Sequence, residues 1–113
     1  MTRKEMQAAT LSYNGALVLQ AMTQGNQYGF EIMRIVGLPS GTVYPLLRRL
    51  EAAGLVSSNW EEEREAHADR RPARRYYRAT EKGDVALADA RVRIAEQQAA
   101  VFGSLAGDLG KSQ

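Results

Sequence analysis

The sequence predicts a mainly α-helical fold with one small β-hairpin and a long C-terminal helix. Apolar residues recur at helical spacing in three segments of the first half, residues 4–24, 28–36 and 40–53. Residues 55–60 and 74–79 alternate apolar and polar side chains, as the two strands of a hairpin would. From residue 85 to residue 109 the apolar residues follow a heptad pattern, which indicates a helix that has a partner surface.

The composition is that of a globular protein. Its 113 residues, 44% hydrophobic and 25% charged, can build one domain. There is no run of about 18 apolar residues that could span a membrane, and no apolar signal segment follows Met1. The absence of cysteine excludes a disulfide framework and a thiolate metal site. We therefore expect a cytoplasmic protein with no membrane partner and no cofactor.

Residues 4–24 predict a first helix, which Gly25 and Asn26 end because both favour turns. Its apolar surface, which includes Leu11, is too broad for one narrow stripe, so we expect it to contact more than one surface. A second, short helix is predicted over residues 28–36. The segment 37–39 ends this helix, because proline disfavours a helical conformation in the residue before it.

The next helix, within residues 39–55, follows after a tight turn, and the two short helices form a helix-turn-helix candidate. Ser40 or Gly41 can cap its start, and Gly54 has the position of a C-cap glycine. Pro45 removes one helical hydrogen bond, so we expect a slightly distorted start or a helix that begins near Thr42. The side chains off its apolar stripe are hydroxyls and guanidiniums, as the reading of a DNA groove requires: Thr42, Tyr44, Arg48 and Arg49. An ordinary amphipathic helix with solvated arginines would give the same pattern.

The two alternating segments predict a hairpin with a long, mobile tip. Five of the nine residues 70–78 are arginines, and such clustering indicates a phosphate-binding surface more clearly than the net charge of +2 does. We expect Glu61–Glu63 to oppose arginines across the ladder. Only the tip arginines and Arg74 would then be free for phosphate, and the candidates are Arg70, Arg71 and Arg74. A solvated loop without contacts is the alternative. Trp60 is expected to cover the core beneath the hairpin.

Thr80 is predicted to cap the last helix, whose apolar residues form two stripes on nearly opposite sides. One side would pack on its own domain and the other on a second copy of the chain, unless the helix is sandwiched within a monomer. The predicted dimer interface consists of Leu11, Val85, Ala88, Val92, Ala95, Ala99 and Phe102, and the heptad continues to Ala106 and Leu109. The chain would thus comprise a winged helix-turn-helix in residues 1–80, whose first helix also contributes to the dimer. Residues 81–113 would form a dimerisation helix with a polar tail.

In this order the elements resemble the PadR family of winged-helix transcription regulators, in the short form with a single C-terminal helix. The resemblance rests on Tyr-Gly-Phe-Glu-Ile at residues 28–32, on residues 40–55 with their Gly-Thr-Val-Tyr-Pro-Leu core, and on residues 75–83. Together these motifs cover about residues 10–90. The link before Ser40 is shorter than in most members, and the hairpin tip is longer than in the shortest wings.

The resemblance implies a homodimeric regulator, usually a repressor, that binds double-stranded DNA at a pseudo-palindromic operator. It places Ser40, Gly41, Thr42, Tyr44 and Arg48 at the groove and Tyr28 near a phosphate. Arg48 and Arg49 can each contact a guanine through two hydrogen bonds. Arg49 has the alternative of pairing with Glu51 or a phosphate, and Tyr44 that of a structural role.

Two other functions stay open: a protein-interaction module that uses the hairpin, and a ligand-sensing dimer that small aromatic molecules release from DNA. Some members of the family bind flat ligands between their C-terminal helices, but here that surface is mostly alanine and valine, with Phe102 as its only aromatic residue. An enzyme is not indicated, because no nucleophile–base pair, phosphate-binding glycine loop or metal cluster is evident. His67, the single histidine, has no cysteine or second histidine with which to share a metal.

Overall fold

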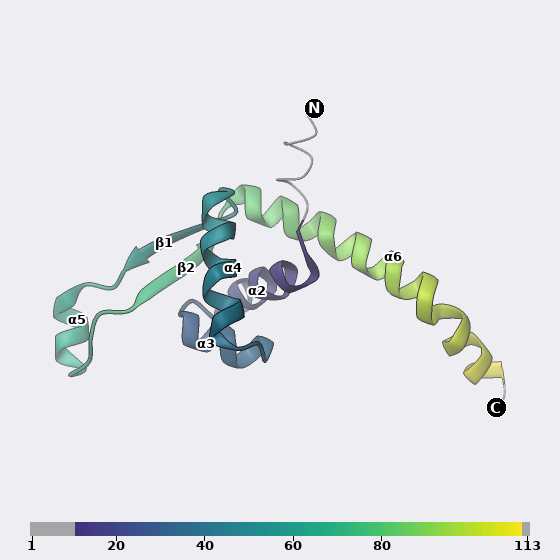
Figure 1. The fold of residues 1–113 in the computed structure, drawn as a ribbon, viewed down its shortest axis with the longest axis horizontal. Coiled ribbons are helices and arrows are strands. Elements are labelled where there is room, and N and C mark those ends of the chain that lie inside the picture. Colours follow the sequence, from purple (N-terminus) through teal and green to yellow (C-terminus); the bar gives the residue numbers. More distant parts are fainter. Residues whose placement is uncertain (1–10, 112–113) are drawn as a thin grey trace.

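The computed structural model describes residues 11–111, and the side chains of residues 11–103. Helices dominate, with one two-stranded antiparallel sheet, so the predicted fold class is confirmed (Figure 1). The elements are α2 (Tyr13–Thr23), α3 (Gly29–Val36), α4 (Ser40–Ala52), β1 (Val56–Trp60), α5 (Glu63–Ala68), β2 (Arg75–Ala79) and α6 (Glu81–Lys111). No helix in this part of the chain is both long enough and apolar enough to cross a membrane.

Helix α2 begins at Tyr13, later than the predicted start at residue 4. Ser12 has an extended backbone, and its hydroxyl accepts a hydrogen bond from the N–H of Gly15 at 3.0 Å, which makes it an N-cap. The expectation of one continuous helix over residues 4–24 is therefore wrong at Leu11 and Ser12, while residues 4–10 lie outside the described part. Serine favours this break because its side chain replaces a backbone partner.

The core surrounds α2. Val18 and Leu19 are fully buried there, which confirms that the first helix has more than one partner surface. Further large side chains of the core come from α3, α4, the residue before β1, β2 and α6: Ile32, Val43, Leu47, Leu55, Tyr77 and Leu87. Leu11 belongs to the same cluster and is only 5% exposed. Because its own chain already covers most of this side chain, Leu11 has little surface left for the predicted dimer interface.

The helix-turn-helix consists of α3 and α4. Gly37 ends α3 in the left-handed region (φ 72°), which glycine adopts without strain. Pro39 is the N-cap of α4, because its carbonyl oxygen accepts from the N–H groups of both Thr42 and Val43 at 3.0 Å. Ser40 and Gly41 are therefore the first and second residues of the helix. The expectation that one of them caps α4 is wrong. The bond from Thr42 gives the first turn a tighter, 3₁₀-like start, and α4 continues through Pro45.

A glycine motif ends α4 as predicted. Gly54 has φ 78°, and its N–H donates to the carbonyl of Glu51 at 3.0 Å. The N–H of Leu55 reaches back to the carbonyl of Leu50 at 2.9 Å. These two bonds form a Schellman motif, which directs the chain from α4 into β1.

The hairpin of β1 and β2 is the wing, and it extends away from the helices (Figure 1). The pairing runs from Val56–Ala79 to Trp60–Arg75. Val56, at the root of the wing, is 2% exposed, whereas Trp60, at the far end of the same strand, is 65% exposed. The prediction that Trp60 covers the core is wrong, because its side chain stays largely exposed and borders an open hollow together with Tyr28, Phe30 and Tyr44.

The wing tip holds a short helix, α5, instead of the mobile loop that its polar sequence predicted. Ala66 is buried in this helix, and the N–H of Arg71 donates to its carbonyl at 3.1 Å. The turn after α5 contains Arg70, a non-glycine residue with positive φ (57°). The tip is therefore a folded unit with contacts of its own.

Helix α6 packs on α2 at its start and then leaves the domain (Figure 1). Ala86, Leu87 and Ala90 are buried against the core, so one face of α6 covers its own domain. Of the second predicted stripe, Leu87 lies in this face and Ile94 is half-buried, whereas Val101 is 62% exposed. The other stripe is exposed in the single chain at all six predicted interface positions that have described side chains: Val85, Ala88, Val92, Ala95, Ala99 and Phe102. Ala106 and Leu109 lie outside the described side chains.

Candidate nucleic-acid interface

The outer face of α4 carries the residues predicted to read DNA. Ser40, Gly41, Arg48 and Arg49 are exposed, and Thr42 is half-buried. Within residues 11–103, neither Arg48 nor Arg49 takes part in an ion pair. The alternative of an Arg49–Glu51 pair is not observed. Glu51 instead accepts from the Nη2 of Arg75 at 3.0 Å. Both guanidiniums of α4 are therefore open to a partner.

Tyr44 has a structural contact as well as an exposed edge. A β-carbon at Gly29 would lie 2.6 Å from Cε1 of Tyr44, so the tyrosine ring packs directly on the backbone at the start of α3. Only glycine permits this approach. The contact fixes the two helices of the helix-turn-helix against each other, and 41% of Tyr44 remains exposed.

Tyr28, the predicted phosphate contact, joins the helix-turn-helix to the wing. It is the N-cap residue of α3, and its N–H donates to the carboxylate of Glu31 at 3.2 Å. It also forms an isolated bridge with Tyr76 of β2, whose ring stands edge-on at a centroid distance of 6.5 Å. The guanidinium of Arg74 lies over the Tyr28 ring, 3.7 Å from its centroid, at a distance suited to a cation–π contact.

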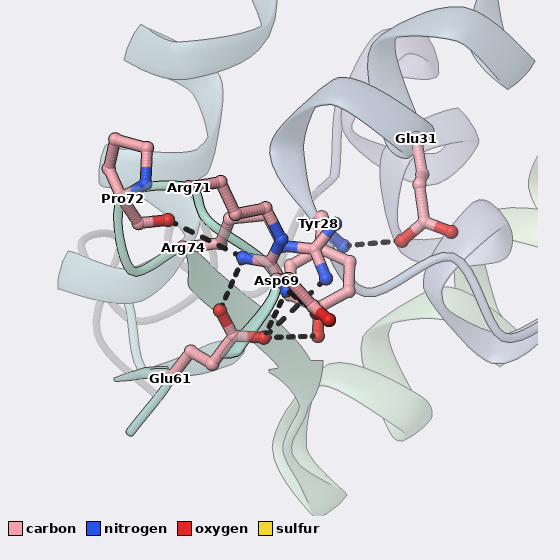
Figure 2. A network of polar contacts seen from close by, with 7 residues as sticks. All are labelled: Tyr28, Glu31, Glu61, Asp69, Arg71, Pro72 and Arg74. Atoms are coloured by element: carbon pink, nitrogen blue, oxygen red, sulfur yellow. Dashed lines mark hydrogen bonds and ion pairs between the residues drawn. The ribbon is translucent and has the colours of Figure 1, made fainter. Parts of the chain in front are cut away.

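Glu61, the residue after β1, is the centre of a polar cluster (Figure 2). Its carboxylate accepts two hydrogen bonds from Arg71, at 2.5 Å and 2.9 Å. Arg74 reaches the same carboxylate at 3.5 Å, and the hydroxyl of Tyr28 donates to it at 3.4 Å. Asp69 adds a second acceptor for Arg71 at 3.1 Å. The cluster thus joins the wing tip, the wing strands and the start of α3.

The electrostatics of Glu61 follow from this geometry. The hydrogen bond from Arg71 lowers the pKa of Glu61 from an ordinary value of 4.5 to about 2, although burial of the carboxyl opposes the shift. The pKa of Arg71 is raised in return, chiefly by the same hydrogen bond. Glu61 therefore stays ionised at any pH at which the protein would work.

These contacts correct the expectation for the wing. Glu61 does oppose Arg74 across the ladder, where its N–H donates to the carbonyl of Arg74 at 2.7 Å, but Glu62 and Glu63 begin α5 instead. Arg71 and Arg74 are not free, because both face Glu61. Of the three candidates on the wing, only Arg70 lies outside the ion pairs found in residues 11–103.

A second ion pair, which the sequence did not suggest, ties the wing to α4. The Nη2 of Arg75 donates to Glu51 at 3.0 Å, and its Nε donates to the hydroxyl of Ser58 at 2.9 Å. Ser58 also donates to the carboxylate of Glu51. The partner of Arg75 lies on a different element, and no local pattern in the sequence pointed to it.

The start of α6 is fixed to the end of α4. The hydroxyl of Thr80 accepts from the N–H of Gly83 at 3.0 Å, which confirms Thr80 as the N-cap, and donates to the carbonyl of Gly54 at 2.7 Å. The Nζ of Lys82 donates to the carbonyl of Ala53 at 3.0 Å. The recognition-helix candidate and the long helix therefore meet without a flexible linker.

A pocket of about 320 Å³ lies between α2 and α6, away from the surface just described. Its walls are mostly apolar, and the polar groups at its edge come from Gln20, Arg91 and Gln98. In the described part of the chain no three histidine or acidic side chains gather as they would around a metal ion.

The transcriptional regulator PadR-like family matches residues 18–89, which include all of α3, α4 and the wing. The chain belongs to the PadR-like family of transcriptional regulators. No curated protein sequence is similar enough to this chain to count as a match.

Several solved structures have a fold similar to that of this PadR-like chain. PcaV from Streptomyces coelicolor has a TM-score of 0.74 at 21% identity, over 97% of this chain and 84% of that one. The protein smu.1704 from Streptococcus mutans has a TM-score of 0.71 at 23% identity, over 88% of this chain and 90% of that one. A PadR family regulator from Clostridium difficile has a TM-score of 0.62 at 24% identity, over 87% and 98%. This PadR-like protein is thus a transcriptional regulator of the winged-helix type.

Proposed function

We propose that this PadR-like regulator is a sequence-specific DNA-binding repressor that acts as a homodimer on a pseudo-palindromic operator. The observation that carries the proposal is the outer face of α4. Its apolar back is buried through Val43, Leu46, Leu47 and Leu50, while its exposed face presents hydroxyls and two guanidiniums with no ion-pair partner within residues 11–103. A rigid helix of this kind fits the major groove of B-DNA.

The proposed roles of the residues differ. Arg48 is the main candidate for base recognition, with Arg49 beside it, because an arginine pairs with a guanine through two hydrogen bonds. Ser40, Gly41 and Thr42, in the first turn, would approach the DNA backbone or base edges. A β-carbon at Gly41 would meet no atom of the protein, so this position is open towards a partner. Tyr28, Tyr44 and Arg70 would position the protein on phosphates.

The proposed dimer uses the exposed stripe of α6. Val85, Val92 and Phe102 are each at least 60% exposed in the single chain, which is unusual for large apolar side chains at regular heptad spacing. Residues 1–80 would then form the DNA-binding part and residues 81–113 the dimerisation part. Two recognition helices related by the dimer axis should lie about 34 Å apart, one turn of B-DNA.

A gel-shift experiment with the DNA upstream of the protein's own gene tests base recognition. Arg48→Ala is expected to weaken binding to this DNA and to reduce discrimination against random DNA, by about 1–3 kcal/mol for a lost bidentate contact. Arg91→Ala on α6 removes the same charge far from α4 and serves as the matched control. Equal preference of wild type and Arg48→Ala for operator over random DNA would remove Arg48 from base recognition.

The strongest alternative within this family is a ligand-sensing dimer that small aromatic molecules release from DNA. The pocket between α2 and α6 favours it, because Tyr13, Leu17 and Ile94 give it an apolar wall beside Arg91. PcaV has been solved in complex with its natural ligand. A protein-interaction module is the other alternative, and salt distinguishes it: DNA binding weakens steeply with ionic strength, whereas an apolar partner interface is much less sensitive.

A further inference from the structure

The wing of this protein carries many arginines, but its charge is largely cancelled within the wing itself. Glu61 and Asp69 both accept from Arg71, and Glu61 also faces Arg74, so two carboxylates balance two guanidiniums (Figure 2). The side chain of Glu61 is only 7% exposed. A DNA phosphate would have to displace this buried carboxylate before it could bind Arg71.

The cluster joins the two strands and the tip of the wing to a residue more than thirty positions earlier in the sequence. Glu61 follows β1, Arg71 follows α5, Arg74 precedes β2, and Tyr28 caps α3. Arg74 lies between the carboxylate and the Tyr28 ring, with its guanidinium 3.7 Å from the ring centroid. The wing tip is therefore fixed to the wing strands and, through Tyr28, to the helix that precedes α4.

We propose that Glu61 is a positioning residue, which holds Arg71 and Arg74 as internal counter-ions so that these arginines orient the wing and do not bind phosphate. Of the three wing arginines expected to bind phosphate, Arg70 then remains; it follows Asp69 in the turn after α5 and takes part in no ion pair within residues 11–103. This inference rests on the proposed DNA-binding function.

The physical basis is the geometry of a bipartite site. A recognition helix and a wing gain affinity together only if both meet the duplex at the same time. The buried pair between Arg71 and Glu61 uses two parallel hydrogen bonds, which fix direction as well as distance. Loss of the Glu61 carboxylate leaves Arg74 without its ion-pair partner and Arg71 with Asp69 alone, which frees the tip to move relative to α4.

The first experiment compares Glu61→Gln with Glu62→Gln. Both variants remove one negative charge, but Glu62 is exposed and does not belong to the cluster. An operator sequence is first obtained by selecting bound DNA from a random pool with the wild-type protein. The binding of each variant to this operator and to random DNA is then measured. Glu61→Gln should weaken operator binding by about 2- to 30-fold, the effect expected of a residue that acts on a binding site through its neighbours. Its binding to random DNA should be unchanged or tighter, because the positive charge of the wing increases. Glu62→Gln should keep its operator preference.

The second experiment uses the salt dependence of operator binding, which counts neutralised phosphates. Arg70→Gln should reduce the slope of log K against log salt by about 0.9, the value for one phosphate contact on B-DNA. Arg71→Gln should weaken operator binding without a change of slope, because Arg71 neutralises Glu61 and not a phosphate. These two variants decide the question even if Glu61→Gln does not fold.

The outcomes are distinct. A slope for Arg71→Gln that falls as much as that for Arg70→Gln overturns the proposal, because Arg71 would then bind phosphate directly. Operator binding by Glu61→Gln that equals or exceeds that of the wild type overturns it as well. A wild-type protein that shows no preference for any DNA selected from a random pool would contradict the proposed function, which is a different failure.

Discussion

The backbone of Gly83 lies directly against the carbonyl oxygen of Leu55. A β-carbon at residue 83 would stand 2.0 Å from that oxygen, far inside contact distance. The same carbonyl accepts a hydrogen bond from the N–H of Thr80 at 3.0 Å. The first turn of α6 therefore packs, backbone on backbone, against the segment that follows α4.

We expect Gly83→Ala to destabilise the protein. The added methyl group meets backbone atoms, which cannot rotate away, and overpacking of this kind costs about 1–3 kcal/mol or more. Gly103→Ala is the matched control, because its β-carbon would meet no atom and alanine is favoured over glycine in a helix by about 0.5–1 kcal/mol. Urea unfolding followed by circular dichroism measures both changes. A Gly83→Ala protein as stable as Gly103→Ala would contradict the contact.

Replacement of Thr80 tests the junction through its hydrogen bonds. Thr80→Ala removes the N-cap of α6 and the donor to the carbonyl of Gly54, and we expect a loss of about 1 kcal/mol in the free energy of unfolding. Thr80→Ser keeps the hydroxyl and should retain most of the stability. If serine and alanine lower the midpoint of thermal unfolding equally, the hydroxyl is not the group that matters.

The buried pair of Glu61 predicts a dependence of stability on pH. Its pKa is about 2 in the folded protein and near 4.5 without the pairing, so its contribution is fully present above pH 4.5 and is lost as the pH falls towards 2. Wild type should therefore be more stable than Glu61→Gln at pH 6. The difference should shrink between pH 4.5 and pH 2, which unfolding curves at a series of pH values can follow. A difference that is constant over this range would rule out the ion pair as its source.

The exposed stripe of α6 predicts the oligomeric state. In a dimer built on this stripe, Val92→Asp puts a charge into the apolar seam and should give monomers. Gln97→Asp introduces the same charge on an exposed position outside the stripe and should leave the dimer intact. Sedimentation velocity at micromolar concentration distinguishes the two masses. A wild-type protein that sediments as a monomer would refute this use of the stripe.

Except for α5, the helices and strands could be predicted because their signals are local. The stripe of Val43 to Leu50 and the alternation of β2 depend only on the spacing of neighbouring residues. Gly54 could be recognised at the end of α4 for the same reason, since a left-handed residue at that point needs glycine. The error at Ser12 also has a local cause, because a serine inside a helical pattern can cap a new helix instead of continuing the old one.

The side-chain contacts of the candidate site could not be predicted to the same extent. The carboxylate of Glu61 accepts hydrogen bonds from Arg71, ten residues later in the sequence, and from Tyr28, at the start of α3. Which residues become its partners depends on how the wing tip folds. The sequence pattern alone therefore left Arg71 among the arginines expected to be free for phosphate. The prediction for Trp60 was wrong for a related reason. The alternation in β1 predicts which face of the wing carries Trp60, but not how far the wing extends beyond the core.

The direct junction of α4 and α6 has a mechanical consequence. Helix α6 has 31 residues and, at 1.5 Å per residue, a length of about 46 Å. Thr80 and Lys82 at the start of α6 are hydrogen-bonded to Gly54 and Ala53 at the end of α4, so we expect a tilt of α6 to move α4 with it. In a dimer joined through α6, the crossing angle of the two long helices would then set the distance between the recognition helices. A molecule that enters the pocket between α2 and α6 could release DNA by changing that angle alone, without touching α4.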